Sequence, residues 1–140
     1  MDGVSAVSAV ASLILLAGKV TVQAHGFLSK VKDCPHRFKN IEIDLKSTTS
    51  ILTQLEELLE ESKNAGKTNP LDHSADFRDA IEGLREIFAE LTVLIKKYDG
   101  TSFWKRTRWA SVGQDEAVQL ARLLATQKSN LQFMLVLAQR

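Results

Sequence analysis

Apolar residues recur along this chain at alternating steps of three and four, the spacing that places side chains on one face of an α-helix. Three segments show such an apolar row, which we call a seam. In residues 35–63 the seam is formed by Ile41, Leu45, Thr48, Leu52, Leu55 and Leu59. In residues 71–98 it is formed by Phe77, Ile81, Leu84, Phe88, Leu91, Ile95 and Tyr98, and in residues 114–138 by Leu120, Leu124, Leu131, Met134 and Ala138. No segment alternates with the period of two that a β-strand requires. The pattern predicts an all-helical fold.

Residues 4–32 form a fourth predicted helix of a different kind. Serine and other polar residues lie on one face of this helix. An apolar stripe lies on another face, at helical spacing, and comprises Val4, Val7, Ala11, Ile14, Gly18 and Leu28. Residues 3–18 carry no charge at all. Because small and apolar residues surround most of the helix, we expect it to be only weakly amphipathic.

Glycine and proline separate the predicted helices. Pro35 suits the first turn of a helix and biases the residue before it out of the helical region, which predicts a tight corner there. Residues 64–70 combine glycine, proline and polar residues in the clearest loop, and Gly100 ends the third helix. Residues 103–110 form an aromatic and basic connector with room for a short extra helix. Short connections favour antiparallel neighbours, so we predict an up-and-down four-helix bundle that forms a single domain over residues 1–140.

The overall charge of the chain is nearly balanced, although its distribution is not. The formal net charge is +1, so we expect no nucleic-acid partner. Residues 47–90 contain four basic and ten acidic residues, whereas residues 91–140 contain eight basic and three acidic ones. The lone Cys34 cannot form an intramolecular disulfide, and no basic residue precedes the apolar start as it would in a signal peptide. These features favour an intracellular setting.

The sequence offers no constellation of residues for catalysis or metal binding. Its three histidines have no spacing that would place two of them on one helical face, and its glutamate cluster in residues 56–61 reads as a solvated acidic face. Gly66, Lys67 and Thr68 match the end of a P-loop, but Glu61 stands where the first glycine is required. We therefore expect no enzyme activity, no cofactor and no metal site.

Two surfaces contain candidate functional residues. A membrane-targeting helix would use Val4, Val7, Val10, Leu13, Ile14, Leu15 and Leu16. A lipid or partner contact, suited to anionic headgroups at a membrane interface, would use Lys96, Lys97, Trp104, Lys105, Arg106, Arg108 and Trp109, with Phe103 beside them. Both surfaces have a simpler interpretation, in which the first helix belongs to the core and the connector packs onto the bundle. Lys128, beside the fourth seam, is expected to snorkel or to meet a carboxylate of a neighbouring helix.

Short motifs at both ends of the chain resemble a known family. The opening stretch Met1-Asp2-Gly3-Val4-Ser5-Ala6-Val7-Ser8-Ala9-Val10-Ala11-Ser12-Leu13-Ile14, continued by Gly18-Lys19-Val20, is similar to the start of the HeLo-like N-terminal domains of fungal STAND, or NOD-like receptor, proteins. Arg108-Trp109-Ala110, followed by Lys128-Ser129-Asn130-Leu131, resembles the close of those domains. The resemblance spans essentially the whole chain.

This resemblance implies a helical bundle that serves as a cell-death-inducing or signalling effector domain. In such domains an N-terminal helix, here residues 1–20, is released on self-association and targets plasma membrane phospholipids, under the control of a receptor NTPase or an amyloid-motif module. The chain contains neither regulator, so we expect it to be a domain excised from a longer protein, cytoplasmic at rest and at the plasma membrane on activation. The alternative is a helical protein–protein interaction (adaptor) domain without membrane activity.

Overall fold

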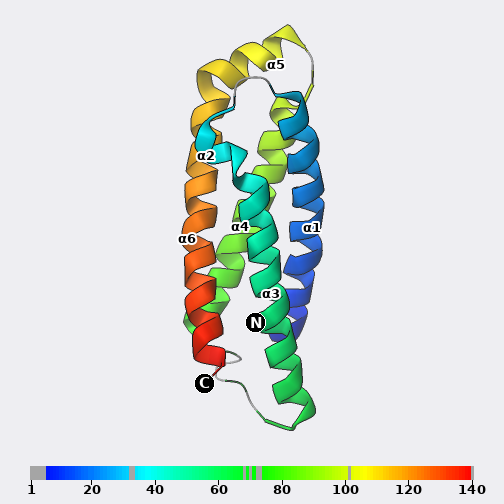
Figure 1. The fold of residues 1–140 in the computed structure, drawn as a ribbon, viewed down its shortest axis with the longest axis vertical. Helices are drawn as coiled ribbons and strands as arrows, with labels where there is room; N and C mark the ends of the chain where they lie inside the picture. Colours follow the sequence, from blue (N-terminus) through cyan, green and yellow to red (C-terminus); the bar gives the residue numbers. More distant parts are fainter. Residues whose placement is uncertain are drawn as a thin grey trace.

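The computed structural model describes residues 6–31, 34–67, 69, 71, 74–100 and 102–139. Over this part of the chain the elements are helical and no strand is present, which confirms the all-helical class. They are α1 (Ala6–Lys30), α2 (His36–Lys39), α3 (Ile41–Asn64), α4 (Ala75–Tyr98), α5 (Phe103–Arg108), the π-helix η2 (Trp109–Gly113) and α6 (Gln114–Ala138). Four long helices lie side by side, and the short α2 and α5 lie at one end of the molecule (Figure 1).

The four long helices pack in a ring. α1 packs against α3 and α4, and α6 packs against the same two helices, so that α3 and α4 occupy opposite corners. The connections from α1 to α3 and from α4 to α6 therefore join neighbours, whereas residues 65–74 lead from α3 to the opposite corner. This arrangement departs from our expectation that every connection joins neighbouring helices. A connection of this length permits such a crossing, as longer crossovers do in other helical bundles.

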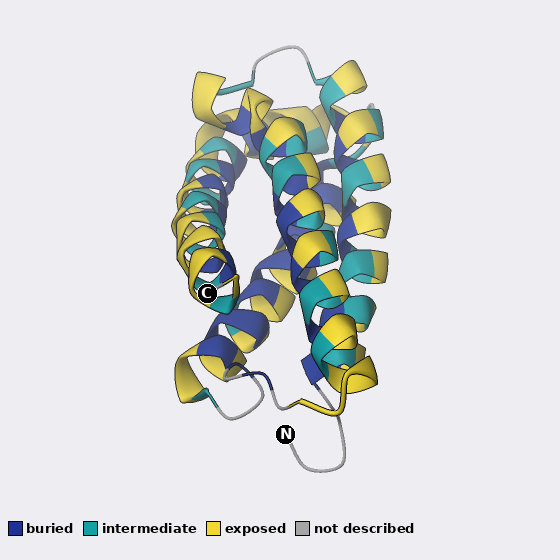
Figure 2. Ribbon diagram, turned by 60° about the horizontal axis from the view of Figure 1, so that its bottom comes forward, coloured by how far each residue is buried: buried dark blue, intermediate teal, exposed yellow. Residues whose placement is uncertain are grey.

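The core is built from the predicted seams. Every predicted seam residue of α3 and α4 is buried, and on α6 Leu120, Leu124 and Leu131 are buried while Met134 and Ala138 pack at its edge. Figure 2 shows the buried faces of the long helices turned toward one another. Burial of these apolar side chains is the main favourable contribution to folding.

The buried face of α1 lies one residue away from the predicted stripe. It consists of Ala6, Ala9, Val10, Leu13, Ala17, Val20, Ala24 and Phe27. Of the predicted stripe, Val7, Ala11, Ile14 and Leu28 are half-buried, Gly18 is exposed and Val4 lies outside the described residues. The predicted stripe was wrong because a helix that is apolar on most sides gives no sharp periodic signal. Alanines make up half of the true face, so α1 buries less apolar surface than the phenylalanine- and leucine-rich α4.

Local signals explain where the helices begin and end. The segment predicted as one helix over residues 35–63 is divided at Asn40 into α2 and α3. At the start of α4 the Ser74 hydroxyl accepts a hydrogen bond from the Phe77 N–H at 3.2 Å, a typical N-cap. Gly66 and Gly100, which follow the ends of α3 and α4, have φ values of +70° and +142° that side chains disfavour.

Lys128 of α6 forms an ion pair with Asp44 of α3, which confirms that it meets a carboxylate of a neighbouring helix. Its Nζ lies 3.0 Å from Asp44 Oδ1, and the two side chains are 23% and 21% exposed. We expect Asp44→Ala to lower the free energy of unfolding by about 1–2 kcal/mol, because Lys128 keeps a largely desolvated charge without a partner. Adding Lys128→Met should recover part of that loss in urea denaturation. Strictly additive single effects would contradict this coupling.

Candidate functional site

α1 carries the residues predicted to target a membrane, and the structure distributes them around the helix. Val10 and Leu13 are completely buried, Val7, Ile14 and Leu16 are half-buried against the core, Leu15 is 75% exposed, and Val4 lies outside the described residues. Most of these side chains therefore hold the bundle together in this conformation. Among the described residues of this set, Leu15 is the most available to a lipid or a partner without a change of structure.

By length and composition α1 is apolar enough to cross a membrane. Its 25 residues span about 37 Å, more than the roughly 30 Å of a bilayer core. Lys19 and Lys30 are its only lysine or arginine residues, and it has no acidic residue. A core helix of a soluble protein and a signal sequence meet the same criterion. The composition of α1 is thus compatible with a membrane-targeting helix and with a helix that belongs only to the core.

A group of aromatic and basic side chains is presented at one end of the molecule by α5, which we call the α5 tip (Phe103–Arg108). Ser102 begins this helix by accepting a hydrogen bond from the backbone of Lys105 at 3.2 Å. Phe103 and Trp104 are each 74% exposed and stack edge to face with ring centroids 6.1 Å apart. Three basic residues and no carboxylate follow within the helix. The α5 tip therefore combines exposed aromatic area with positive charge.

The basic residues predicted for this surface differ in how far they are engaged. Arg106 and Arg108 are exposed. Lys105 is half-buried and donates from Nζ to the backbone carbonyl of Asp99 at 2.7 Å. Lys96 and Lys97 lie in the last turn of α4, and Lys97 pairs with Glu116 of α6 at 3.6 Å. The last turn of α4 thus contributes one exposed lysine and one that is linked to α6.

Trp109 lies inside the molecule, contrary to its prediction as a surface contact. It is 5% exposed, and its ring meets Phe27 and Tyr98 edge to face at centroid distances of 5.2 and 5.6 Å. Phe38 lies 6.0 Å away on another side. Trp109 begins the π-helix η2, whose wider turn shifts the direction of side chains relative to a continuous α-helix. The alternative interpretation, packing of the connector onto the bundle, therefore holds for Trp109 in this conformation.

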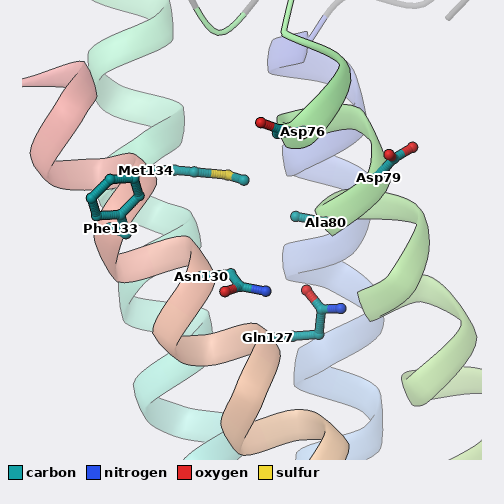
Figure 3. Close-up of a pocket in the computed structure, with 7 residues that line it drawn as sticks. All are labelled: Asp76, Asp79, Ala80, Gln127, Asn130, Phe133 and Met134. Carbon is teal, nitrogen blue, oxygen red and sulfur yellow. The ribbon is translucent and has the colours of Figure 1, made fainter.

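A pocket of about 390 Å³ opens between α4 and α6 toward the end of the molecule opposite α5, and we call it the α4–α6 pocket. Its lining residues are Asp76, Asp79, Ala80, Gln127, Asn130, Phe133 and Met134 (Figure 3). Phe133 is largely exposed, and Gln127 Oε1 is buried without a hydrogen-bond partner among the described residues. The hydrophobic pattern of the chain did not predict this pocket. Its one signal was the polar Gln127, which interrupts the seam of α6.

A second groove of about 400 Å³ lies between the same two helices, nearer to α5. The exposed Val93 of α4 and Leu123 of α6 face it, and Glu90, Lys97 and Glu116 are among the polar residues that line it. This groove is more apolar than the α4–α6 pocket, and it could accept an amphipathic helix from a partner.

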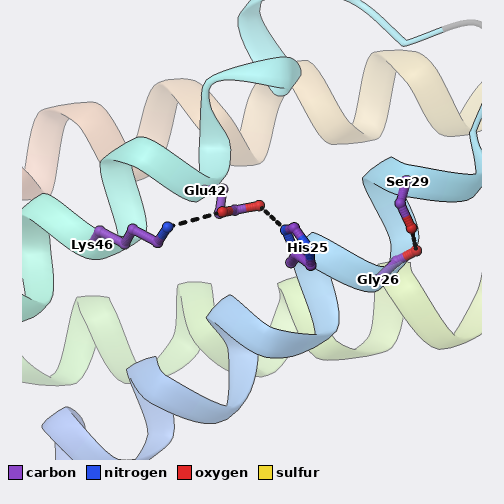
Figure 4. Close-up of polar contacts among 5 residues, drawn as sticks. All are labelled: His25, Gly26, Ser29, Glu42 and Lys46. Carbon is purple, nitrogen blue, oxygen red and sulfur yellow. Dashed lines mark hydrogen bonds and ion pairs between the residues drawn. The ribbon is translucent and has the colours of Figure 1, made fainter.

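Polar contacts link α1 to α3 on the outside of the bundle. His25 Nδ1 lies 2.9 Å from one carboxylate oxygen of Glu42, and Lys46 Nζ lies 3.0 Å from the other (Figure 4). Hydrogen bonds from His25 and Lys46 hold the pKa of Glu42 below its usual value. In the next turn of α1 the Ser29 hydroxyl donates to the Gly26 carbonyl at 2.8 Å. Because His25 and Glu42 lie near the surface, they add only weakly to the packing that holds α1.

Comparisons with family models, with curated proteins and with solved structures find no match for this chain. Within the described residues no group of three or more histidine, cysteine, aspartate or glutamate side chains is placed to hold a metal ion. The features that bear on function are therefore the geometry of α1, the α5 tip and the α4–α6 pocket, together with the motifs of the sequence.

Proposed function

We propose that this chain is a HeLo-like domain that acts as a cell-death-inducing or signalling effector of a fungal NOD-like receptor. It does so by self-association and by targeting the plasma membrane through α1. An up-and-down four-helix bundle, with its two middle helices at opposite corners, is part of this proposal. The observation that carries it is the composition of α1, a helix that could cross a bilayer and yet supplies one wall of the core.

The alanine-rich contact face means that α1 is held in the bundle by smaller side chains than α4 is. Four of its eight buried residues are alanines, whereas α4 buries two phenylalanines and a row of leucines and isoleucines. Less apolar area is therefore exposed when α1 leaves than when α4 leaves. Self-association shifts the population toward the released state only if that state associates more tightly than the closed bundle. The released apolar face then enters the bilayer.

The charge pattern of α1 limits how it enters the membrane. Residues 6–18 carry no charge and span about 20 Å as a helix, which is shorter than the bilayer core. Lys19 follows directly, so a transmembrane position requires its long side chain to snorkel toward the headgroups. The start of α1 and the α5 tip lie toward opposite ends of the bundle. A bundle that stands on the α5 tip would hold the start of α1 away from the bilayer, which is why insertion requires release.

Leakage of a trapped dye from anionic phospholipid vesicles tests this function. The chain is added as purified and also after fusion to a module that forces it to oligomerise, and we expect leakage to rise strongly on oligomerisation. Absence of both binding and leakage in the forced oligomer would overturn the membrane mechanism. Deletion of residues 1–20 is a poor variant for this test because it removes Val10, Leu13 and Val20 from the core.

An adaptor function without membrane activity is the second candidate, and the groove at Val93 and Leu123 favours it. Exposed apolar residues with charged neighbours are typical of surfaces that bind an amphipathic helix. This function predicts a stable complex with a helical partner and no vesicle leakage. Substitution of Val93 would then weaken the complex, whereas substitution on the exposed side of α1 would not.

A further inference from the structure

Two surfaces of this chain are chemically complementary. The α5 tip presents two exposed aromatic rings beside three basic residues. The α4–α6 pocket presents two aspartates together with Phe133 and Met134. Aromatic rings pack favourably against other rings and against methionine sulfur, and arginine pairs with carboxylates. The α5 tip therefore supplies aromatic rings and positive charge, and the α4–α6 pocket supplies the apolar side chains and carboxylates that bind them.

The polar groups of the pocket add a second kind of complementarity. Figure 3 shows the side chains of Asp76, Gln127 and Asn130 turned toward the space between α4 and α6. Gln127 Oε1 is buried there and lacks a hydrogen-bond partner among the described residues. A buried acceptor without a donor is unfavourable. The indole N–H of an inserted tryptophan is a donor that can satisfy it once the Gln127 side chain turns outward, and a pocket of about 390 Å³ is large enough for an indole ring.

The two surfaces cannot meet within one molecule. The α5 tip precedes α6 at one end of the bundle, whereas Asn130 lies 16 residues into α6, about 24 Å further along its axis. Contact between them therefore requires a second copy. Such a contact joins two different patches, so a pair of chains keeps one unused tip and one unused pocket, and further copies can add.

We propose that the α5 tip of one chain docks into the α4–α6 pocket of a second copy, so that chains associate head to tail. Trp104 enters between α4 and α6 against Met134 and Phe133, and Arg108 approaches Asp76 and Asp79. The uneven distribution of charge along the chain supports this pairing, because the pocket aspartates belong to the acidic residues 47–90 and the tip to the basic residues 91–140. The inference names the surface of the self-association in the proposed function, and it depends on that proposal for its biological role.

A lipid surface is the competing occupant of the α5 tip. Anionic headgroups attract basic residues, and tryptophan favours the membrane interface. A lipid surface accounts for the tip alone, however, and leaves the acidic, aromatic pocket unexplained. A second copy accounts for both surfaces, so the observations favour it.

Sedimentation velocity without lipid tests the head-to-tail contact. The chain is run over a concentration series at low and high salt, and we expect association that salt weakens. The tip variant carries Trp104→Ala and Arg108→Glu, and the pocket variant carries Asp76→Lys and Asp79→Lys. Each variant alone should associate at least about tenfold more weakly. An equal mixture of the two should form dimers and nothing larger, because only one intact tip and one intact pocket remain.

A matched control reverses two acidic residues elsewhere. Glu57→Lys with Glu60→Lys on the exposed side of α3 makes the same charge change as the pocket variant and should associate like the original chain. Circular dichroism melting verifies that all variants fold. A chain that stays monomeric at every concentration, or variants that associate normally, would overturn the proposal. Loss of vesicle binding by the tip variant with unchanged association would assign the tip to lipid. Because the sedimentation measurements contain no lipid, their outcome is independent of the leakage test.

Discussion

Trp109→Ala is expected to lower the free energy of unfolding by about 3–5 kcal/mol, whereas Trp104→Ala should change it by no more than about 0.5 kcal/mol. The two tryptophans stand five residues apart on the same connector, yet one is 5% exposed and the other 74%. Trp109 joins α1, α2 and α4 through its contacts with Phe27, Phe38 and Tyr98. Removal of the Trp109 side chain leaves a cavity where these elements meet. Removal of the exposed Trp104 side chain leaves none.

Urea denaturation followed by far-ultraviolet circular dichroism measures both variants. Gly113→Ala approaches the same cluster from the other side and should cost about 1–3 kcal/mol, because a Cβ there would lie 2.7 Å from the Trp109 ring and 2.9 Å from Tyr98. Equal stability of the two tryptophan variants would mean that the aromatic cluster does not hold the connector in place. It would also remove our reason for separating Trp109 from the α5 tip.

The parts of the fold that followed from the sequence are those with one strongly apolar face. On α3 and α4 the three- and four-residue spacing of large apolar residues identified the buried positions, from Ile41 to Leu59 and from Phe77 to Tyr98. Such helices have only one way to bury their apolar residues, so the periodicity alone defines the face. The limits of α6 were also predicted correctly, as residues 114–138.

The remaining features depend on packing that no local pattern encodes. α1 is apolar on several sides, so its buried face was decided by α3 and α4 and not by its own period. The burial of Trp109 depends on a π-turn, and the α4–α6 pocket depends on which helices become neighbours after the chain crosses from α3 to α4. Composition could identify Trp104 and Trp109 as one group, but only the three-dimensional arrangement separates them.

A lysine on the outside of α1 should separate membrane insertion from folding. Leu15 is 75% exposed in the bundle, so Leu15→Lys should leave the free energy of unfolding within about 0.5 kcal/mol of the original. In an inserted α1 the same position lies within the charge-free residues 3–18, one helical turn before Lys19, where a lysine costs less than the roughly 2.5–3.5 kcal/mol of the bilayer centre. We therefore expect dye leakage from anionic vesicles to fall roughly tenfold in the forced oligomer.

Two matched lysines make this result interpretable. Leu13→Lys buries an unpaired charge at a fully buried position and should unfold the bundle, at a cost of at least about 4–5 kcal/mol. Val93→Lys makes a similar change at an exposed position of α4 and should leave both folding and leakage intact. If Leu15→Lys leaks as strongly as the original chain, α1 does not enter the bilayer. If the forced oligomer of the original chain does not leak and Val93→Lys abolishes binding of a helical partner, the groove between α4 and α6 is the functional surface, and the adaptor function takes the place of the membrane mechanism.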